Sequence, residues 1–165
     1  MSILKVDTIN EKTSGNGVLI PGHVIQIQNV TRDGAANSTS STSFVDTGLS
    51  LNITPKFATS KILVIVHQVT SLLGGSDHTR IDFRCIESNS STELYRMDYH
   101  GNDVAVTNIQ RNVSGSGVFQ CSNTNQLTFK TQLQKANSDS SETGTIYYDW
   151  YVGSKLTMTA LEIAQ

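Results

Sequence analysis

The side chains that could carry chemistry in this sequence are few and scattered. The four histidines show no metal-ligand spacing; they are His23, His67, His78 and His100. Cys85 or Cys121 with His100 is a conceivable nucleophile and base pair, but nothing in the neighbouring sequence supports it. The sequence has no Gly-x-Ser-x-Gly elbow and no phosphate-binding loop. We therefore expect no enzymatic reaction, no metal and no cofactor.

Paired carboxylates are the remaining route to catalysis. A glycoside hydrolase needs two carboxyl groups roughly 5–9.5 Å apart. Asp98 with Asp103, or Glu87 with Glu93, could lie opposite each other across a hairpin. Charges on loops and strand faces are more often simply solvated, so we interpret these residues as surface charge. A carbohydrate-binding module or glycan hydrolase stays open as an alternative function.

Two polar segments hold the best candidates for binding a sugar. Residues 72–78 and 98–104 combine glycines, which let a ligand approach the backbone, with polar and aromatic side chains. An aromatic ring offers a stacking face, and Asp and His offer hydrogen-bond partners. The candidate glycan or partner contacts are Asp77, His78, Tyr99, His100 and Asp103. The alternative is that both segments are ordinary hairpin turns.

An aromatic cluster near the C-terminal end is a candidate subunit contact. Successive side chains on a strand point to opposite faces, so Tyr148 and Trp150 form one set and Tyr147 and Tyr151 the other. We expect the first set to pack in the core. Tyrosine is enriched at protein interfaces, so we predict that Tyr147 and Tyr151 lie at a seam between subunits. Stacking on a glycan is the alternative.

Short strands are the elements that must position these residues. Apolar and polar residues alternate over residues 49–54, 80–85, 127–133 and 146–152, as on half-buried strands. Residues 62–66 are apolar at every position and mostly β-branched, which is typical of a strand covered on both faces. Polar clusters separate these runs, and no window shows a helical period with caps. About eight to ten short strands predict an all-β, jelly-roll-like β-sandwich.

The N-terminal segment differs from the rest of the chain. A Thr-Ser-Gly-Asn-Gly turn at 13–17 and the Pro-Gly pair at 21–22 interrupt any regular element there. We interpret residues 1–22 as an N-terminal arm for attachment or partner contact, and residues 23–165 as the β-sandwich domain. The arm is too apolar for a tail in water. We expect it to pack on a partner through Ile3, Val6, Ile9, Val18 and Ile20.

The composition bounds the remaining partners. A chain of 165 residues can form one domain with its own core. Charged residues make up 16% of it and the formal net charge is −2, which argues against a nucleic-acid binder. No apolar run is long enough to cross a bilayer or to form a signal peptide. We therefore expect that the chain is made in a cytoplasm and does not insert into a membrane. We also expect Cys85 and Cys121 to be free and buried.

Several segments carry a family resemblance when they are taken together. They are ILKVDTI with TSGNG at 3–9 and 13–17, GHVIQI at 22–27, SFVDTGLSLNITP at 43–55, SKILV at 60–64 and TMTALEIA at 157–164. Together they resemble virion structural proteins of tailed phages that infect marine and other aquatic bacteria. The middle of the chain, about 72–141, is not covered. These are fold and packing motifs, so no catalytic residue is carried over.

The resemblance implies a trimeric β-sandwich displayed on a virion. The predicted function is a non-enzymatic tail-fibre or knob protein, whose arm attaches to other virion proteins and whose loops meet a host surface glycan. A capsid decoration (cement) protein that stabilises the head is the first alternative. The expected partners are further copies of the chain in a homotrimer, other virion proteins and the glycan.

Overall fold

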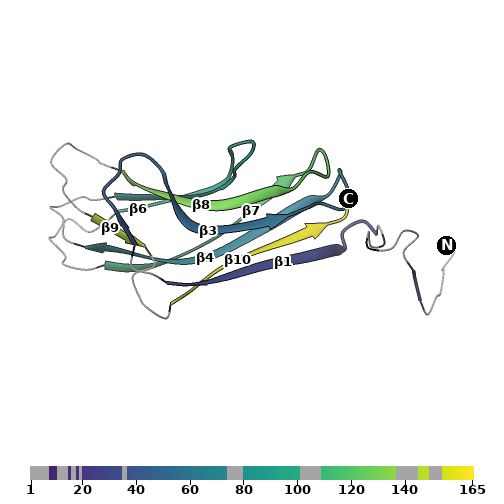
Figure 1. The fold of residues 1–165 in the computed structure, drawn as a ribbon, viewed down its shortest axis with the longest axis horizontal. Helices are drawn as coiled ribbons and strands as arrows, with labels where there is room; N and C mark the ends of the chain where they lie inside the picture. Colours follow the sequence, from purple (N-terminus) through teal and green to yellow (C-terminus); the bar gives the residue numbers. More distant parts are fainter. Residues whose placement is uncertain are drawn as a thin grey trace.

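The computed structural model describes residues 8–10, 15, 18, 20–34, 37–73, 80–100, 109–136, 145–148 and 154–165. For residues 71–73, 99–100 and 109–111 it describes the backbone alone. Every regular element in this part of the chain is a strand (Figure 1). The strands are β1 (Val24–Asp33), β2 (Asn37–Thr39), β3 (Val45–Ile53), β4 (Lys61–Leu73), β5 (Arg80–Glu87), β6 (Thr92–His100), β7 (Ile109–Gln120), β8 (Leu127–Ala136), β9 (Thr145–Tyr148) and β10 (Lys155–Ile163).

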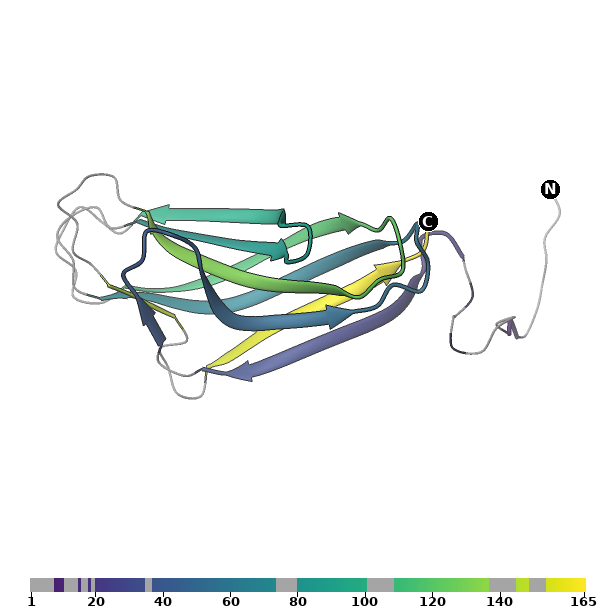
Figure 2. The same cartoon turned by 45° about the horizontal axis from the view of Figure 1, so that its top comes forward.

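The strands form two antiparallel sheets that face each other (Figures 1 and 2). In the first, sheet A, β7 runs along one whole edge of β4. The other edge of β4 is shared, because β10 pairs with its first half and β9 with its second half. Outside these lie β1, paired with β10, and β2, paired with β9. The second sheet, sheet B, has the order β3-β8-β5-β6.

This connectivity is that of a jelly roll. If β1 with β2 counts as one interrupted strand, and β9 with β10 as another, the chain has eight strands in this part. Sheet A then holds the first, eighth, third and sixth strands, and sheet B the second, seventh, fourth and fifth. Such pairing of early with late strands in two facing sheets is the double Greek key of a jelly roll. The predicted all-β, jelly-roll-like sandwich is confirmed.

The two ends of the sandwich differ. At one end, the arm end, β1 begins, β10 ends and the connections 54–60, 88–91 and 121–126 turn the chain (Figure 1). At the opposite end, the loop end, β4, β6 and β8 stop and β5, β7 and β9 start. The connections 74–79, 101–108 and 137–144, which join these strands in sequence, lie outside the described residues.

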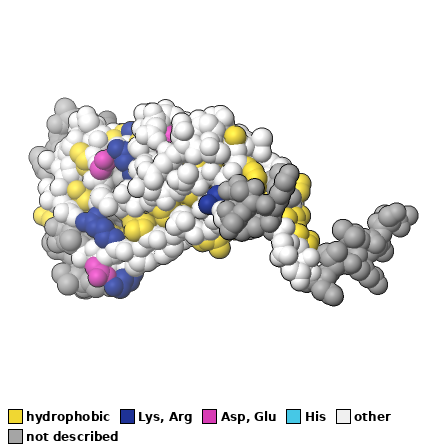
Figure 3. Space-filling model, turned by 45° about the vertical axis from the view of Figure 1, so that its right-hand side comes forward, with side chains coloured by type: hydrophobic (Ala, Val, Ile, Leu, Met, Phe, Trp, Pro, Cys, Tyr) yellow, Lys and Arg dark blue, Asp and Glu magenta, His cyan; other side chains and the backbone are white. Residues whose placement is uncertain are grey.

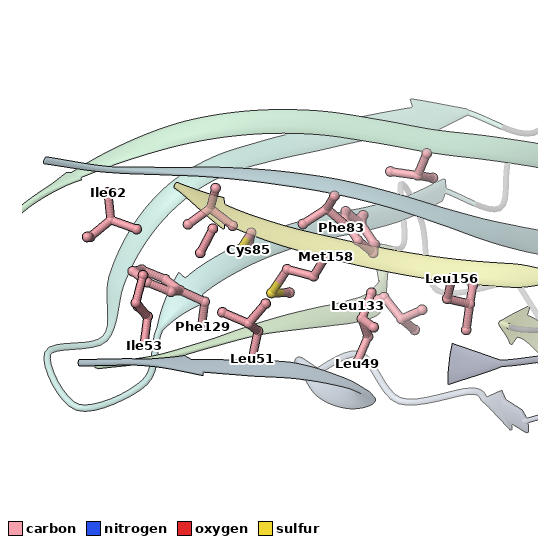
Figure 4. Close-up of a cluster of buried hydrophobic side chains, with 14 of the residues drawn as sticks. Leu49, Leu51, Ile53, Ile62, Phe83, Cys85, Phe129, Leu133, Leu156 and Met158 are labelled. Atoms are coloured by element: carbon pink, nitrogen blue, oxygen red, sulfur yellow. The ribbon is translucent and has the colours of Figure 1, made fainter. Parts of the chain in front are cut away.

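The core lies between the sheets and is built by alternating inward side chains (Figure 4). Leu49, Leu51 and Ile53 of β3 are buried, as the alternation predicts. The fully buried phenylalanines Phe83 and Phe129 bring the largest side chains from sheet B into this core. Most inward positions are therefore the apolar positions of the period-two pattern. The polar side chains of Gln68, Thr70 and Thr131 are also buried.

One expectation about β4 is wrong for the single chain. Ile62, Val64 and Val66 are buried to within 1% exposure, but Ile65 is 45% exposed and Leu63 is only half-buried. The run 62–66 is thus covered on one face, because sheet A has sheet B on its inner side and no second layer of this chain on its outer side among the described residues.

The two cysteines are free and buried, as predicted. Burial raises the pKa of the Cys85 thiol to about 12 and that of Cys121 to about 11. A thiol with so high a pKa holds almost no thiolate at neutral pH and is a poor nucleophile.

Candidate functional site

Two of the predicted glycan contacts, Tyr99 and His100, lie at the loop end of the sandwich. Tyr99 and His100 are the last residues of β6, and their backbones pair with Ile81 and Arg80 of β5. Asp77, His78 and Asp103 lie outside the described residues, so their role stays a prediction. Because β5 and β6 are hydrogen-bonded neighbours, the chain leaves the first segment and enters the second at adjacent points of sheet B.

The aromatic cluster divides between the two faces of sheet A, as alternation requires. Ile146 is fully buried and Tyr148, two positions on, packs against the core. Tyr147 between them is half-buried and therefore belongs to the outer face, with its backbone paired to Ser38 and Ser71. Trp150 and Tyr151 are outside the described residues, and the predicted subunit seam stays a prediction.

The N-terminal arm joins the sandwich through backbone hydrogen bonds to the C-terminal end of β10. The N–H of Gly22 donates to the carbonyl of Ala164 at 2.9 Å, and the N–H of Ala164 donates to His23 at 2.9 Å. Gly22 has a φ of +85°, a conformation that glycine adopts without strain, so the chain turns sharply there. The point at which the arm leaves is therefore held by the sheet.

The predicted attachment residues of the arm are partly exposed. Ile9 is 57% exposed, whereas Val18 and Ile20 are half-buried. Ile3 and Val6 lie outside the described residues. An isoleucine that is more than half exposed is stabilised little by burial in its own chain, which is consistent with an arm that binds elsewhere.

A buried carboxylate braces the arm end. Glu162 of β10 is 0% exposed. Its oxygens accept hydrogen bonds from the backbone N–H groups of Lys56 and Phe57 at 2.8 and 3.2 Å, and from the side-chain amide of Gln26 at 2.6 Å. The carboxylate thus connects β10, β1 and the β3–β4 turn beside the exit of the arm.

The described carboxylates that were considered for glycoside hydrolysis bind other groups of this chain. Glu87 and Glu93 lie on the paired strands β5 and β6, but Glu87 is 1% exposed and bound within its own turn. Glu93 faces outward and forms ion pairs with Arg84 and Arg96. Asp98 is bound to Arg80, and its proposed partner Asp103 is outside the described residues. The described carboxylates are therefore already occupied by partners of this chain.

The pKa values of these carboxylates also shift in the wrong direction for a general acid. Burial by itself raises the pKa of Glu87. Hydrogen bonds from Ser90, Asn89 and Thr128 lower it by more, so that the pKa lies below its ordinary value. The hydrogen bond and charge of Arg96 lower the pKa of Glu93. A glycosidase acid needs a raised pKa. Among the described residues, no three His, Cys, Asp or Glu side chains gather to hold a metal.

A pocket of about 340 Å³ opens at the arm end between two turns of sheet B and the end of β7. Phe119 and Leu127 give it an apolar part, and Asn89, Ser90 and Asn125 are among its polar residues. Its carboxylate, Glu87, already accepts hydrogen bonds from Ser90, Asn89 and Thr128. The described part of this pocket therefore offers a ligand no unoccupied charge.

The outer face of sheet B is a ladder of matched polar groups. Asp46 of β3 accepts from Lys130 at 2.9 Å and from Gln132 at 2.6 Å. Gln132 in turn accepts from Arg84, whose guanidinium lies 3.7 Å from the ring centroid of Phe44. The charged groups named here are thus paired within the chain.

The outer face of sheet A is different in kind. Strand register brings Ile27, Leu161, Leu63 and Val118 into one row across β1, β10, β4 and β7. Ile27 is 60% and Val118 56% exposed. We call the arm-end half of this surface the apolar face; its apolar side chains are Val24, Ile27, Leu63, Ile65, Val118, Leu161 and Ile163.

Sequence reasoning missed the apolar face. The sequence signal for it was the apolar character of the outward residues of 62–66, which we expected to be buried under another layer. In Figure 3 most of the visible charged side chains lie toward the loop end, whereas hydrophobic side chains reach the surface at several places along the sandwich, including near the arm.

Comparisons with known proteins add a likeness of fold. No protein-family model matches the sequence, and no curated protein is significantly similar to it. A solved structure of the VP2 protein in T=1 particles derived from infectious bursal disease virus is similar with a TM-score of 0.41 and 14% identity, covering 98% of this chain and 41% of the other. A 2.6 Å structure of such T=1 particles gives a TM-score of 0.44 at 13% identity over 98% and 41% of the two chains.

A VP2 subviral particle of the same virus gives a TM-score of 0.42 at 13% identity, covering 85% of this chain and 38% of the other. This chain therefore spans about two fifths of the length of the chains it matches. Likeness of this degree assigns no function to it. The described residues include no helix long and apolar enough to span a membrane.

Proposed function

We propose that this chain is a non-enzymatic structural protein of a tailed-phage virion, a homotrimeric β-sandwich knob of a tail fibre or similar appendage. The observation that carries the proposal is the difference between the two ends of the jelly roll. The arm leaves from one end, held by Gly22 and Ala164. The segments that hold the candidate glycan contacts leave from the other end. One end is thus suited to attachment and the other to recognition.

The physical chemistry of the fold supports this assignment. A jelly roll is a rigid scaffold that serves in viral capsid and lectin domains alike. Loops on such a scaffold are where binding residues concentrate, because they vary without disturbing the core. The described carboxylates and thiols have partners or shifted pKa values that do not suit catalysis. A binding protein fits these observations better than an enzyme.

The position of the protein on the particle tests the proposal. Purified phage particles are imaged by cryo-electron microscopy, with an antibody fragment against this chain as a marker. We expect density at the tip of a tail appendage. Density on the head would favour the cement alternative, and absence from purified particles would contradict the proposal.

Host adsorption tests the loop end separately. We expect the variant Tyr99→Ala with His100→Ala to assemble into particles and to adsorb at least tenfold more slowly, because a sugar would lose a stacking face and a hydrogen-bond partner. The matched control is Asn123→Ala with Asn125→Ala at the arm end, which is expected to adsorb normally. Normal adsorption of the Tyr99 and His100 variant would remove these residues from receptor binding.

A further inference from the structure

We propose that the apolar face of sheet A is the surface through which this chain packs against further copies of itself. The inference rests on the proposed self-assembly and names the surface that would carry it. Its occupant is the same face of a second copy, and three such faces around one axis would build the homotrimer.

The apolar composition of β4 predicts that its outer face is also buried. The run 62–66 has the continuous apolar, β-branched character of a strand buried on both faces. Within the single chain only Ile62, Val64 and Val66 are buried, while Leu63 is half-buried and Ile65 is 45% exposed. A second copy on this side would complete the burial that the sequence pattern indicates.

The apolar residues form one contiguous patch. Cross-strand partners on a sheet lie on the same face at about 4.5–5.5 Å between Cβ atoms. The row Ile27, Leu161, Leu63 and Val118 therefore crosses all four strands without interruption. Monomeric proteins seldom expose contiguous apolar patches of this kind, and such patches mark sites of interaction.

The distribution of charge selects a copy of the chain as the partner. Residues near a rotation axis meet their own copies, so a charge there faces an identical charge. On the outer face of sheet A, the described charges lie at its ends: Lys61 at the arm end, and Asp33 with Lys155 at the loop end. The rows between contain apolar, hydroxyl and amide side chains and His67, which lies 2.8 Å from Ser114. The outer face of sheet B, dense in charge, is unsuited to such self-contact.

The size of the surface is adequate. Four strands at about 4.8 Å spacing, over the seven residues of β4 that pair with β10 at about 3.3 Å rise each, cover on the order of 450 Å² in projection. A standard interface buries about 800 Å² of accessible surface per partner. The accessible area of a surface with protruding side chains exceeds its projection, so this face approaches the area that one chain contributes to an interface. Around a three-fold axis the two neighbouring copies share it.

The test is the oligomeric state of the full-length chain, measured by light scattering and sedimentation from about 1 to 100 μM. We expect a trimer for the unaltered protein. The variant Ile27→Asp with Val118→Asp should dissociate to monomers, with at least a 100-fold weaker association, since it places like charges against each other. Both positions are more than half exposed in the single chain, so the monomer itself should keep its fold.

The matched control is Ser50→Asp with Asn52→Asp, which adds the same charge to exposed positions on the outer face of sheet B. It should remain trimeric. Circular dichroism verifies that each variant is folded. A monomeric unaltered protein at 100 μM, or a charge variant on sheet A that associates as tightly as the control, would overturn the inference. A trimer that persists in the charge variant on sheet A would contradict this interface but not the proposed place of the protein on the virion. Particle imaging tests that place independently.

Discussion

Buried carboxylates are the residues on which the stability of the arm end depends most directly. Glu162 and Glu87 are both within 1% of complete burial, and each accepts hydrogen bonds from backbone N–H groups of a turn. A buried charge is tolerated only when hydrogen bonds replace its hydration. These two side chains therefore act as anchors for the turns at 54–60 and 88–91, and removing either one leaves donors without an acceptor.

We expect Glu162→Ala to lower the free energy of unfolding by about 2–4 kcal/mol, because it leaves a cavity and unsatisfied backbone donors. Urea denaturation followed by circular dichroism measures the change. The control Glu93→Ala removes an exposed ion pair on the outer face of sheet B and should cost about 0–1 kcal/mol. Equal losses in the two variants would show that Glu162 is not an anchor.

The pH dependence of stability should report Glu87. Its pKa in the folded chain lies below the ordinary value of 4.5, since hydrogen bonds outweigh the effect of burial. A depressed pKa contributes stability that is fully present above about pH 4.5 and is lost as the pH falls through the folded value. We expect Glu87→Gln to be less stable at pH 7 and to lose less stability than the unaltered protein between about pH 5 and 3. Parallel pH curves for the two proteins, measured by urea denaturation, would contradict this.

At the scale of elements, the edge between β6 and β7 closes the sandwich on the side away from β1. A Cβ on Gly117 would lie 2.7 Å from the Leu94 carbonyl oxygen, and one on Gly115 would lie 2.4 Å from the ring of Tyr95. Glycines at these inward positions of β7 therefore let the backbone of β6 approach it. The two sheets come close at this edge because Gly115 and Gly117 have no side chains to hold them apart.

We expect Gly117→Ala to destabilise the protein by about 1–3 kcal/mol, because β6 must move away from β7. The gain of about 0.4–1 kcal/mol that alanine brings by restricting the unfolded chain is too small to compensate. Thermal and urea denaturation measure the effect. The neighbouring variant Ser116→Ala, at an exposed outward position of the same strand, should lie within about 0.5 kcal/mol of the unaltered protein. A neutral Gly117→Ala would mean that β6 shifts without cost.

At the scale of the whole molecule, we predict that the arm contributes little to the folding of the sandwich. The arm contacts β10 through Gly22, whose N–H donates one backbone hydrogen bond to Ala164. The sandwich closes its core with residues of β3 to β10. Deleting residues 1–22 should therefore cost on the order of 1 kcal/mol and leave unfolding cooperative, while incorporation into particles is abolished.

Two measurements check this prediction. Denaturation of the truncated chain shows whether it unfolds in one transition, and immunoblotting of purified particles shows whether it is incorporated. A truncated chain that fails to fold would make the arm part of the core. One that folds and is incorporated normally would remove the arm from attachment.

Much of the inward face of the sandwich could be predicted from the sequence. Leu49, Leu51 and Ile53 were expected to share one face and are buried together, and Tyr148 was expected to pack inward and does. The reason is local: the side-chain period of a strand is two, so alternation alone assigns each residue to a face. The sequence therefore determined the strand class, the absence of helix in the described part, and the buried state of the cysteines.

Only the tertiary structure shows which strands and which layers lie next to each strand. The same alternation is compatible with any partner strand, so the sharing of one edge of β4 by β9 and β10 follows only from long-range pairing. For the same reason, the sequence marked 62–66 as apolar but could not tell that the sandwich covers only one side of it. The burial of Glu162 likewise depends on long-range contacts, because its backbone donors Lys56 and Phe57 lie in a turn that is distant along the chain. Glu87 takes its hydrogen bonds mainly from its own turn, and only the one from Thr128 is long-range.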